Sequence, residues 1–98
     1  MKECIRQSDK LKTYYFFFSG DNCGIQDANI FFRKLSSANH MHFKIFTEYT
    51  KSSLVNLLID YEDMKHKVSF NSYVMFNVID KTLIAINKEE FELKYQIK

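Results

Sequence analysis

The chain has 98 residues, of which 46% are hydrophobic, with ten Phe and six Tyr; this is enough for one folded domain with its own core and excludes a disordered chain. Fourteen basic residues against twelve acidic ones give a net charge of +2, which is too balanced for a protein that binds nucleic acid mainly by neutralising phosphates. No apolar run approaches the roughly 20 residues of a membrane helix, and the N-terminal MKECIRQSDK lacks the apolar centre of a secretory signal. These features predict a single cytoplasmic domain over residues 1–98.

The first third of the chain predicts a central strand. Residues 1–11 have weak periodicity, which indicates a short helix or a loose arm. Aromatic residues then predict a strand over Lys12 to Ser19, with Tyr15 and Phe17 on one face. The opposite face is equally apolar, carrying Tyr14, Phe16 and Phe18. A strand with two apolar faces is expected at the centre of a sheet that is covered on both sides.

The middle of the chain predicts two helices separated by a strand. Asp27 opens the first helix, which extends to about Ser37 and buries Ala28, Phe31, Phe32 and Leu35. His42 to Tyr49 alternates as a strand, with Phe43 and Ile45 on one face and Lys44, Phe46 and Glu48 on the other. The second predicted helix covers about Ser52 to Met64, with Thr50 or Ser52 as its cap and a stripe of Leu54, Leu57, Leu58 and Tyr61.

The last third predicts strands only. Residues 68–70 and 73–79 are strand-like, Asp80 and Lys81 fit a two-residue turn, and residues 82–87 pair back. Phe91 to Ile97 alternates as a final strand with one apolar face. The predicted order is β-α-β-α-β-β-β. It corresponds to an α+β two-layer sandwich, in which a mixed, mainly antiparallel sheet of four to five strands carries two helices on one face.

The loop SGDNCGIQD, residues 19–27, follows the first strand, where α/β proteins often bind phosphate. It lacks the Lys and Ser/Thr of a P-loop and the three glycines of a dinucleotide site, and Asp21 and Asp27 would repel an anion. An ordinary turn is expected, with positive φ at Gly20 and Gly24. The loop is predicted to be an acidic contact for a protein, through Asp21 and Asn22.

Three further patterns concern chemistry. Cys4 and Cys23 are expected to be free thiols, and Cys23 lacks a histidine base nearby in the expected topology. The pair His40 and His42 has a spacing that metal sites use, but no third ligand accompanies it. We therefore predict no metal site, no cofactor and no acid–base pair.

Acidic residues gather at the end of the second predicted helix. Asp60, Glu62 and Asp63 would oppose the helix macrodipole there. One interpretation is that Lys65 and Lys67 neutralise them. The other is a recognition patch of these acids with Tyr61 and Tyr49, presented to a basic protein surface.

By elimination, the sequence favours a non-enzymatic module that binds another macromolecule sterically. The Lys- and Asn-rich, Pro-free composition is typical of AT-rich genomes and favours an inhibitor, anti-defence or immunity-type protein of a phage or mobile element. One alternative is a nucleic-acid-associated regulator, using Arg33, Lys34, Lys65 and Lys67. Another is a thiol enzyme centred on Cys23. A homodimer is expected if the edge from Phe91 to Ile97 stays uncovered.

Overall fold

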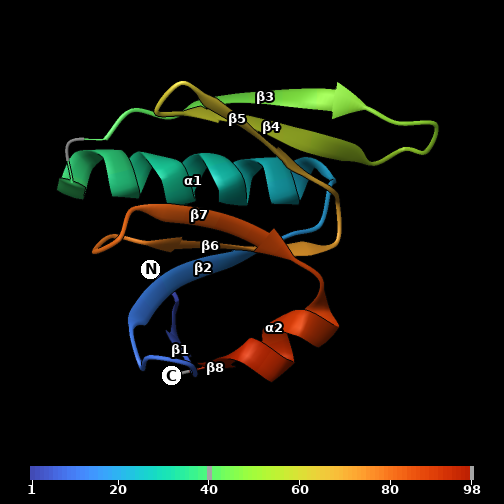
Figure 1. The fold of residues 1–98 in the computed structure, drawn as a ribbon. Helices are drawn as coiled ribbons and strands as arrows, with labels where there is room; N and C mark the ends of the chain where they lie inside the picture. The colour runs from blue at the N-terminus through green and yellow to red at the C-terminus, as the bar shows by residue number, and fades with distance from the viewer. Residues whose placement is uncertain (40, 98) are drawn as a thin grey trace.

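The computed structural model describes residues 1–39 and 41–97, and this part of the chain forms eight strands and two helices (Figure 1). A five-stranded sheet has the order β7-β6-β2-β1-β8, and its strands are β1 (Glu3–Arg6), β2 (Lys12–Phe18), β6 (Ser72–Asn77), β7 (Thr82–Ile86) and β8 (Tyr95–Ile97). A three-stranded sheet has the order β3-β4-β5, and its strands are β3 (Lys44–Tyr49), β4 (Val55–Tyr61) and β5 (Met64–Val68). The predicted α+β class is confirmed.

The two helices lie on opposite faces of the five-stranded sheet. Figure 1 shows α1 (Asn22–Asn39) between the two sheets and α2 (Lys88–Lys94) against the far face of the larger one. Every strand pair in the described residues is antiparallel. The predicted single mixed sheet with both helices on one face is therefore wrong. The physical reason is that α1 does not connect two strands of one sheet but leads the chain from β2 into a second sheet.

Strand β2 lies at the centre of the larger sheet, as predicted, between β1 and β6. Phe16 and Phe18 point into the core around α1, where the ring of Phe16 lies 4.7 Å from that of Phe31. Tyr15 points the other way and packs on Phe91 of α2, at 5.2 Å between ring centroids. The dense aromatic run therefore supplies core residues to both faces of the sheet.

Helix α1 begins at Asn22, five residues before the predicted start at Asp27. Asp21 caps it, because its Oδ1 accepts a hydrogen bond from the Gly24 N–H at 2.8 Å. Gly24 lies inside the helix without the expected positive φ, and a Cβ there would lie 2.6 Å from Ser19 Oγ. The close approach of Ser19 to the helix explains why glycine stands at position 24. The predicted buried face is confirmed, and its members are Ala28, Phe31, Phe32 and Leu35.

The predicted helix from Ser52 to Met64 is wrong, because this segment forms β4 and begins β5. The apolar residues satisfy a period of two as well as the helical spacing. The buried positions alternate along β4, and they are Val55, Leu57, Ile59 and Tyr61. Strand β4 pairs with β3 on one side and with β5 on the other. The spacing of apolar residues within β4 cannot reveal this pairing with other segments of the chain.

The predicted strand from Phe91 to Ile97 is also wrong in its first half. Asn87 caps α2 by accepting a hydrogen bond from the Glu90 N–H at 2.8 Å, and the chain becomes extended only at Tyr95. Phe91 is the buried residue of α2 and stacks on Tyr73 at 4.1 Å between ring centroids. This aromatic contact holds the helix on the sheet.

The N-terminal residues are neither a helix nor a loose arm, because β1 lies between β2 and β8. Arg6 anchors the end of β1 through ion pairs with Asp9 at 2.6 Å and Asp80 at 3.0 Å. Cys4 is buried in the same strand, and burial raises the pKa of its thiol to about 11. Both cysteines are free, and Cys23 is exposed.

The predicted hairpin near the C-terminus is confirmed as β6 and β7, but the predicted two-residue turn at Asp80 and Lys81 is wrong, because residues 78–81 form a four-residue turn between Asn77 and Thr82. The first helix of the described residues is the longer one, and neither helix is long and apolar enough to cross a membrane.

Candidate functional site

The outer face of the three-stranded sheet is the candidate site. The inner face packs on α1 through the buried residues of β4, so the alternate side chains point away from the core. We define the outer face by these alternate residues, which are Lys44, Phe46, Glu48, Asn56, Leu58, Asp60, Lys65 and Lys67. Helix α1 lies on the other side of this sheet, so the outer face is left open (Figure 1).

An apolar pair lies at the centre of the outer face. Phe46 is directly opposite Leu58 in the β3–β4 pair, and Leu58 is opposite Lys67 in the β4–β5 pair. The Phe46 side chain is 51% exposed even though the core accepts most other phenylalanines of the chain. An apolar centre with a charged surround is the usual arrangement of a protein interface.

The surrounding charges are partly fixed by pairing. Glu48 forms an ion pair with Lys67 at 3.0 Å and accepts a hydrogen bond from Asn56 Nδ2 at 3.3 Å. The Lys67 ammonium, first, and the Asn56 amide, second, lower the pKa of Glu48. Because this pair is solvent-exposed, its main effect is to order the outer face and not to stabilise the fold.

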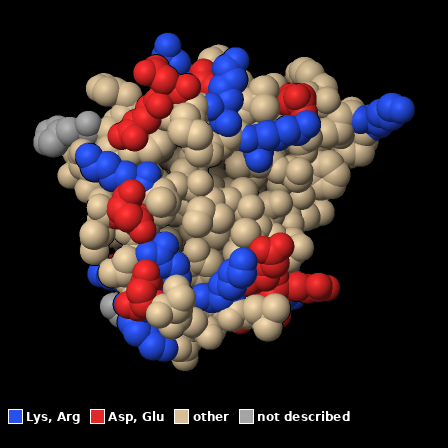
Figure 2. Space-filling model, in the orientation of Figure 1, with Lys and Arg blue, Asp and Glu red and all other residues tan. Residues whose placement is uncertain are grey.

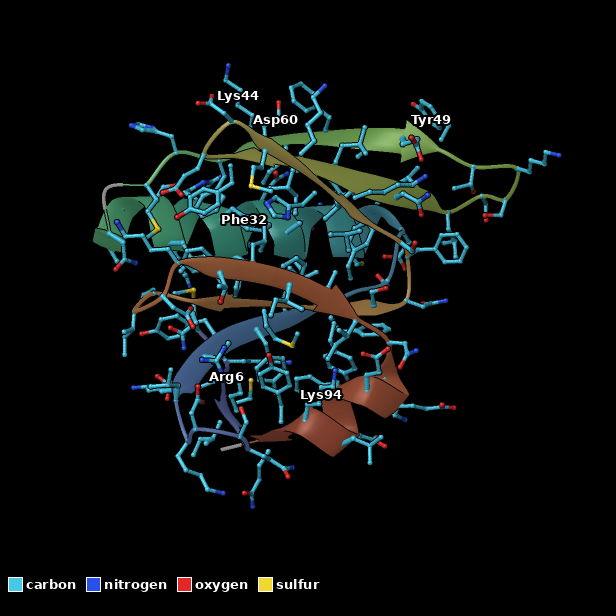
Figure 3. All side chains as sticks on the ribbon, viewed as in Figure 1. Arg6, Phe32, Lys44, Tyr49, Asp60 and Lys94 are labelled. Carbon is cyan, nitrogen blue, oxygen red and sulfur yellow. The ribbon has the colours of Figure 1, made fainter. Side chains whose placement is uncertain are left out.

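Asp60 lies at the other end of the outer face. It is opposite Lys44 in one strand pair and opposite Lys65 in the other, so two cations flank it across the sheet. Figure 3 shows Lys44 and Asp60 close together at the same end of the sheet. The predicted placement of Asp60 in a last helical turn is wrong, and no helix macrodipole acts on it.

Glu62 and Asp63 form the two-residue turn between β4 and β5. Their φ angles are +51° and +62°, in the left-handed region that glycine and asparagine adopt most easily. Two acidic residues in such a turn carry local backbone strain, which often accompanies function. The turn therefore projects two carboxylates beyond the sheet at a conformational cost.

Tyr61 precedes this turn, and its ring lies in the core, where it stacks on Phe43 at 4.7 Å. Its side chain is only 6% exposed, and the buried hydroxyl makes no hydrogen bond of acceptable geometry. Burial, first, and the nearby Glu62 carboxylate, second, raise the pKa of the phenol. A buried hydroxyl without a hydrogen-bond partner is uncommon in proteins, but this one lies too deep for a bound molecule to reach it.

These residues enclose an open depression of about 430 Å³ at the turn. Its walls are His42, Lys44, Asp60, Tyr61, Glu62, Asp63 and Lys65. The structure thus brings together four of the residues predicted to bind a partner, from Asp60 to Asp63, and adds two lysines and a histidine. Three carboxylates against two ammonium groups make the depression mildly acidic.

The remaining residues predicted for partner binding lie at the opposite end of the sheet. Tyr49 ends β3, five residues from Lys44, which places it about 17 Å from the turn end of the sheet (Figure 3). Its side chain is 87% exposed. Asp21 and Asn22 are near this end, because the Gly20 carbonyl accepts a hydrogen bond from the Val55 N–H at 2.9 Å. The predicted site is therefore two separate surfaces.

Asp21 is occupied by its structural role. Besides capping α1, its Oδ1 accepts a hydrogen bond from Ser19 Oγ at 2.6 Å. The Ser19 hydroxyl, first, and the Gly24 N–H, second, lower the pKa of this carboxyl. Helix capping therefore explains why an acidic residue stands at this position, and no binding partner is needed to account for it.

The four basic residues of the nucleic-acid alternative do not form one surface. Arg33 and Lys34 are exposed on α1, and Lys34 lines a depression with Met1 and Lys2 that does not include β5. Lys65 and Lys67 lie on the outer face, where Lys67 is paired with Glu48. Uninterrupted basic tracks are what phosphate binding requires.

The thiol alternative also lacks geometry. Cys23 lies in the first turn of α1, and His42 follows the far end of this 18-residue helix, about 27 Å away. No hydrogen bond joins Cys23 to His42 or His66, and residues 1–39 and 41–97 hold no cluster of three metal-binding side chains. His40, the other half of the predicted histidine pair, lies outside the described residues.

Comparisons with known proteins find no family model, no curated protein and no solved structure that matches the chain. The outer face of the three-stranded sheet is therefore the basis for assigning a function to the protein. Sequence reasoning missed Phe46, although the signal was present, because the alternation of β3 already placed this aromatic beside Lys44 and Glu48 on the polar face.

Proposed function

We propose that the protein is a small, non-enzymatic interaction module that binds another protein through the outer face and the acidic turn of the three-stranded sheet. The observation that carries this proposal is the half-exposed Phe46, centred on a charged face that ends in the strained turn of Glu62 and Asp63. A partner would cover Phe46 and present basic groups to the turn.

The proposed mechanism is steric. A partner that buries Phe46 and Leu58 would gain apolar contact area at the centre, while charges at the rim would set orientation and association rate. A module of this kind acts as an inhibitor or immunity-type protein by covering the surface that it binds.

The test is a quantitative pull-down from the native host with tagged wild type and four variants. Phe46→Asp and Asp63→Lys change the proposed site, while Leu93→Asp and Glu92→Lys make the matched changes on the exposed side of α2. We expect wild type and the α2 variants to capture the same protein. We expect at least a tenfold loss of that protein with either site variant, as is typical when an interface centre is charged or a rim charge is reversed.

Two outcomes would contradict the proposal. One is capture that is unchanged by Phe46→Asp and Asp63→Lys but lost with the α2 variants. The other is capture that disappears after nuclease treatment and falls steeply with salt, which would favour the nucleic-acid alternative. Circular dichroism of all four variants establishes that each remains folded.

A further inference from the structure

A second surface lies where the two sheets meet, and it adjoins the outer face along β5, whose Lys65 and Lys67 border both surfaces. Strand β5 ends the smaller sheet and β7 ends the larger one, and neither has a second neighbour in the described part of the chain. Figure 1 shows the two strands running across the same side of the molecule, one above the other. Two adjoining hollows of about 270 and 260 Å³ lie between them, lined by residues of both strands.

Each of these edges has two residues whose backbone groups face the hollow. The Tyr15 N–H donates a hydrogen bond to the Lys2 carbonyl, so the backbone groups of Tyr15 point toward β1. The direction of the backbone N–H and C=O groups alternates along each antiparallel strand, and the pairing of β2 with β6 and of β6 with β7 carries this alternation across the sheet. The N–H and C=O groups of Leu83 and Ala85 therefore point outward from β7. The two-residue turn makes Tyr61 and Met64 a hydrogen-bonded pair, so the same alternation turns Lys65 and Lys67 outward from β5. Exposed edges of this kind are templates for another strand.

The side chains around the hollows are a mixture of apolar and basic residues, and His66 lines both hollows. Val68 and Leu83 pack into the core, while Met64 is 63% exposed and Ile84 is 37% exposed. Lys65, Lys67 and Lys81 line the hollows, and Glu62 is the acidic residue among the lining groups. Figure 2 views this side and shows uncharged surface over the middle and right, with charged side chains above it, below it and to its left.

We propose that the groove between β5 and β7 binds an extended peptide segment with alternating apolar and acidic side chains. The segment would pair with both edges at once, so the two sheets would become one continuous sheet around α1. Both strands are five residues long, which sets the bound segment at about five residues or 17 Å. Apolar side chains would cover Val68 and Leu83, and acidic ones would lie beside the three lysines.

The experiment uses the full chain and a fluorescent, capped heptapeptide of alternating valine and glutamate, followed by fluorescence anisotropy. We expect saturable binding of this peptide. We expect at least tenfold weaker binding of the valine–lysine peptide, because of charge. We expect the same loss when alternate peptide nitrogens are methylated, because those N–H groups would bond to one of the two edges.

Protein variants locate the binding. Ala85→Pro removes an N–H that faces the groove and leaves the β6–β7 ladder its bonds, so we expect at least a tenfold loss. Lys81→Glu should weaken the valine–glutamate peptide, while the matched change Lys51→Glu in the β3–β4 loop should not. If Ala85→Pro fails to fold, the Lys81→Glu and N-methyl results still decide.

The inference is overturned if the valine–glutamate peptide does not bind, or if the lysine and N-methylated peptides bind equally well. It is also overturned if Lys81→Glu and Lys51→Glu have the same effect. Failure here is distinguishable from failure of the proposed function. Phe46→Asp changes the outer face alone, so it should abolish partner capture and leave peptide affinity within about twofold.

Discussion

The five-stranded sheet is covered on both faces, by α1 and by α2, whereas the three-stranded sheet is covered by α1 on one face only. Aromatic residues of the larger sheet accordingly stack in two cores, as with Phe16 against Phe31 and Tyr73 against Phe91. On the smaller sheet, Phe46 faces outward among charged residues. A sheet face that is covered by a helix buries most of its aromatic residues, whereas the uncovered face of the smaller sheet leaves Phe46 available to a partner.

The two sheets also differ in their turns. The β6–β7 turn is held by Asn77, whose Oδ1 accepts the N–H groups of Ile79 and Asp80, and by the ion pair between Asp80 and Arg6. The β4–β5 turn has two acidic residues in left-handed conformations and an adjacent tyrosine hydroxyl without a partner. Both turns contain residues with positive φ, Lys81 at +56° in the first and Glu62 and Asp63 in the second, so the difference lies in the side-chain contacts that hold the β6–β7 turn.

The largest contrast is expected between two phenylalanine truncations. Phe91→Ala removes the ring that stacks on Tyr73 and Tyr95, so we expect the free energy of unfolding to fall by about 3 to 5 kcal/mol. Phe46→Ala on the outer face should cost less than about 1 kcal/mol, because the ring is half exposed. Urea unfolding followed by circular dichroism measures both, and equal losses would remove the distinction between the sheets.

The next effect concerns the junction between the two sheets. Gly20 has a φ of +86°, and a Cβ there would overlap Phe70 Cβ, while its carbonyl accepts the Val55 N–H. We expect Gly20→Ala to destabilise the protein by about 2 kcal/mol through left-handed strain and this overlap. The matched Ala38→Gly change near the end of α1 should cost about 1 kcal/mol or less. A larger fall in melting temperature for Ala38→Gly than for Gly20→Ala would contradict the structural role of Gly20 at the junction.

A smaller effect depends on pH. Because the pKa of Asp21 is lowered in the folded state, its carboxylate stabilises the fold above the pKa of the unfolded chain, about 3.9, and this contribution disappears as the pH falls through the folded value. Asp21→Ala should therefore lower the melting temperature by about 5 °C at pH 7. The difference between variant and wild type should narrow below about pH 4. A difference that stays constant down to pH 2 would show that the charge has no role.

The smallest effect is a stabilisation. Replacing the strained turn by the double change Glu62→Asn and Asp63→Gly supplies residues that adopt left-handed φ easily, so we expect a gain of about 0.5 to 1 kcal/mol. The same double variant should lose partner capture, because both turn carboxylates are removed. If the double variant is more stable and still captures the partner fully, the turn carboxylates are not part of the binding site.

Local patterns in the sequence predicted the elements whose periodicity has one interpretation. The run from Tyr14 to Phe18 has aromatics on both faces, and the buried face of α1 follows helical spacing without an alternating competitor. The segment from Leu54 to Tyr61 fits both periods, and only pairing with β3 and β5 decides for strand. Phe91 alternates with its neighbours, yet the cap at Asn87 and the stack on Tyr73 make it helical.

The candidate site was predicted in part for the same reason. Asp60 to Asp63 are consecutive, so a charge cluster was evident before any fold was known. The opposition of Phe46 to Leu58 and of Asp60 to Lys44 depends on strand register, which links residues 12 and 16 positions apart. The wrong helix over this segment hid that register, and it also joined Tyr49 to a turn that lies at the other end of the sheet.

Photo-crosslinking in the native host tests whether Phe46 contacts a protein partner. Benzoylphenylalanine replaces Phe46 in one version of the protein, which keeps an aromatic ring on the outer face, and replaces exposed Leu93 on α2 in the other. We expect a discrete protein crosslink from position 46 and none from position 93. A crosslink from position 93 alone, or a crosslink from position 46 to nucleic acid, would contradict this expectation.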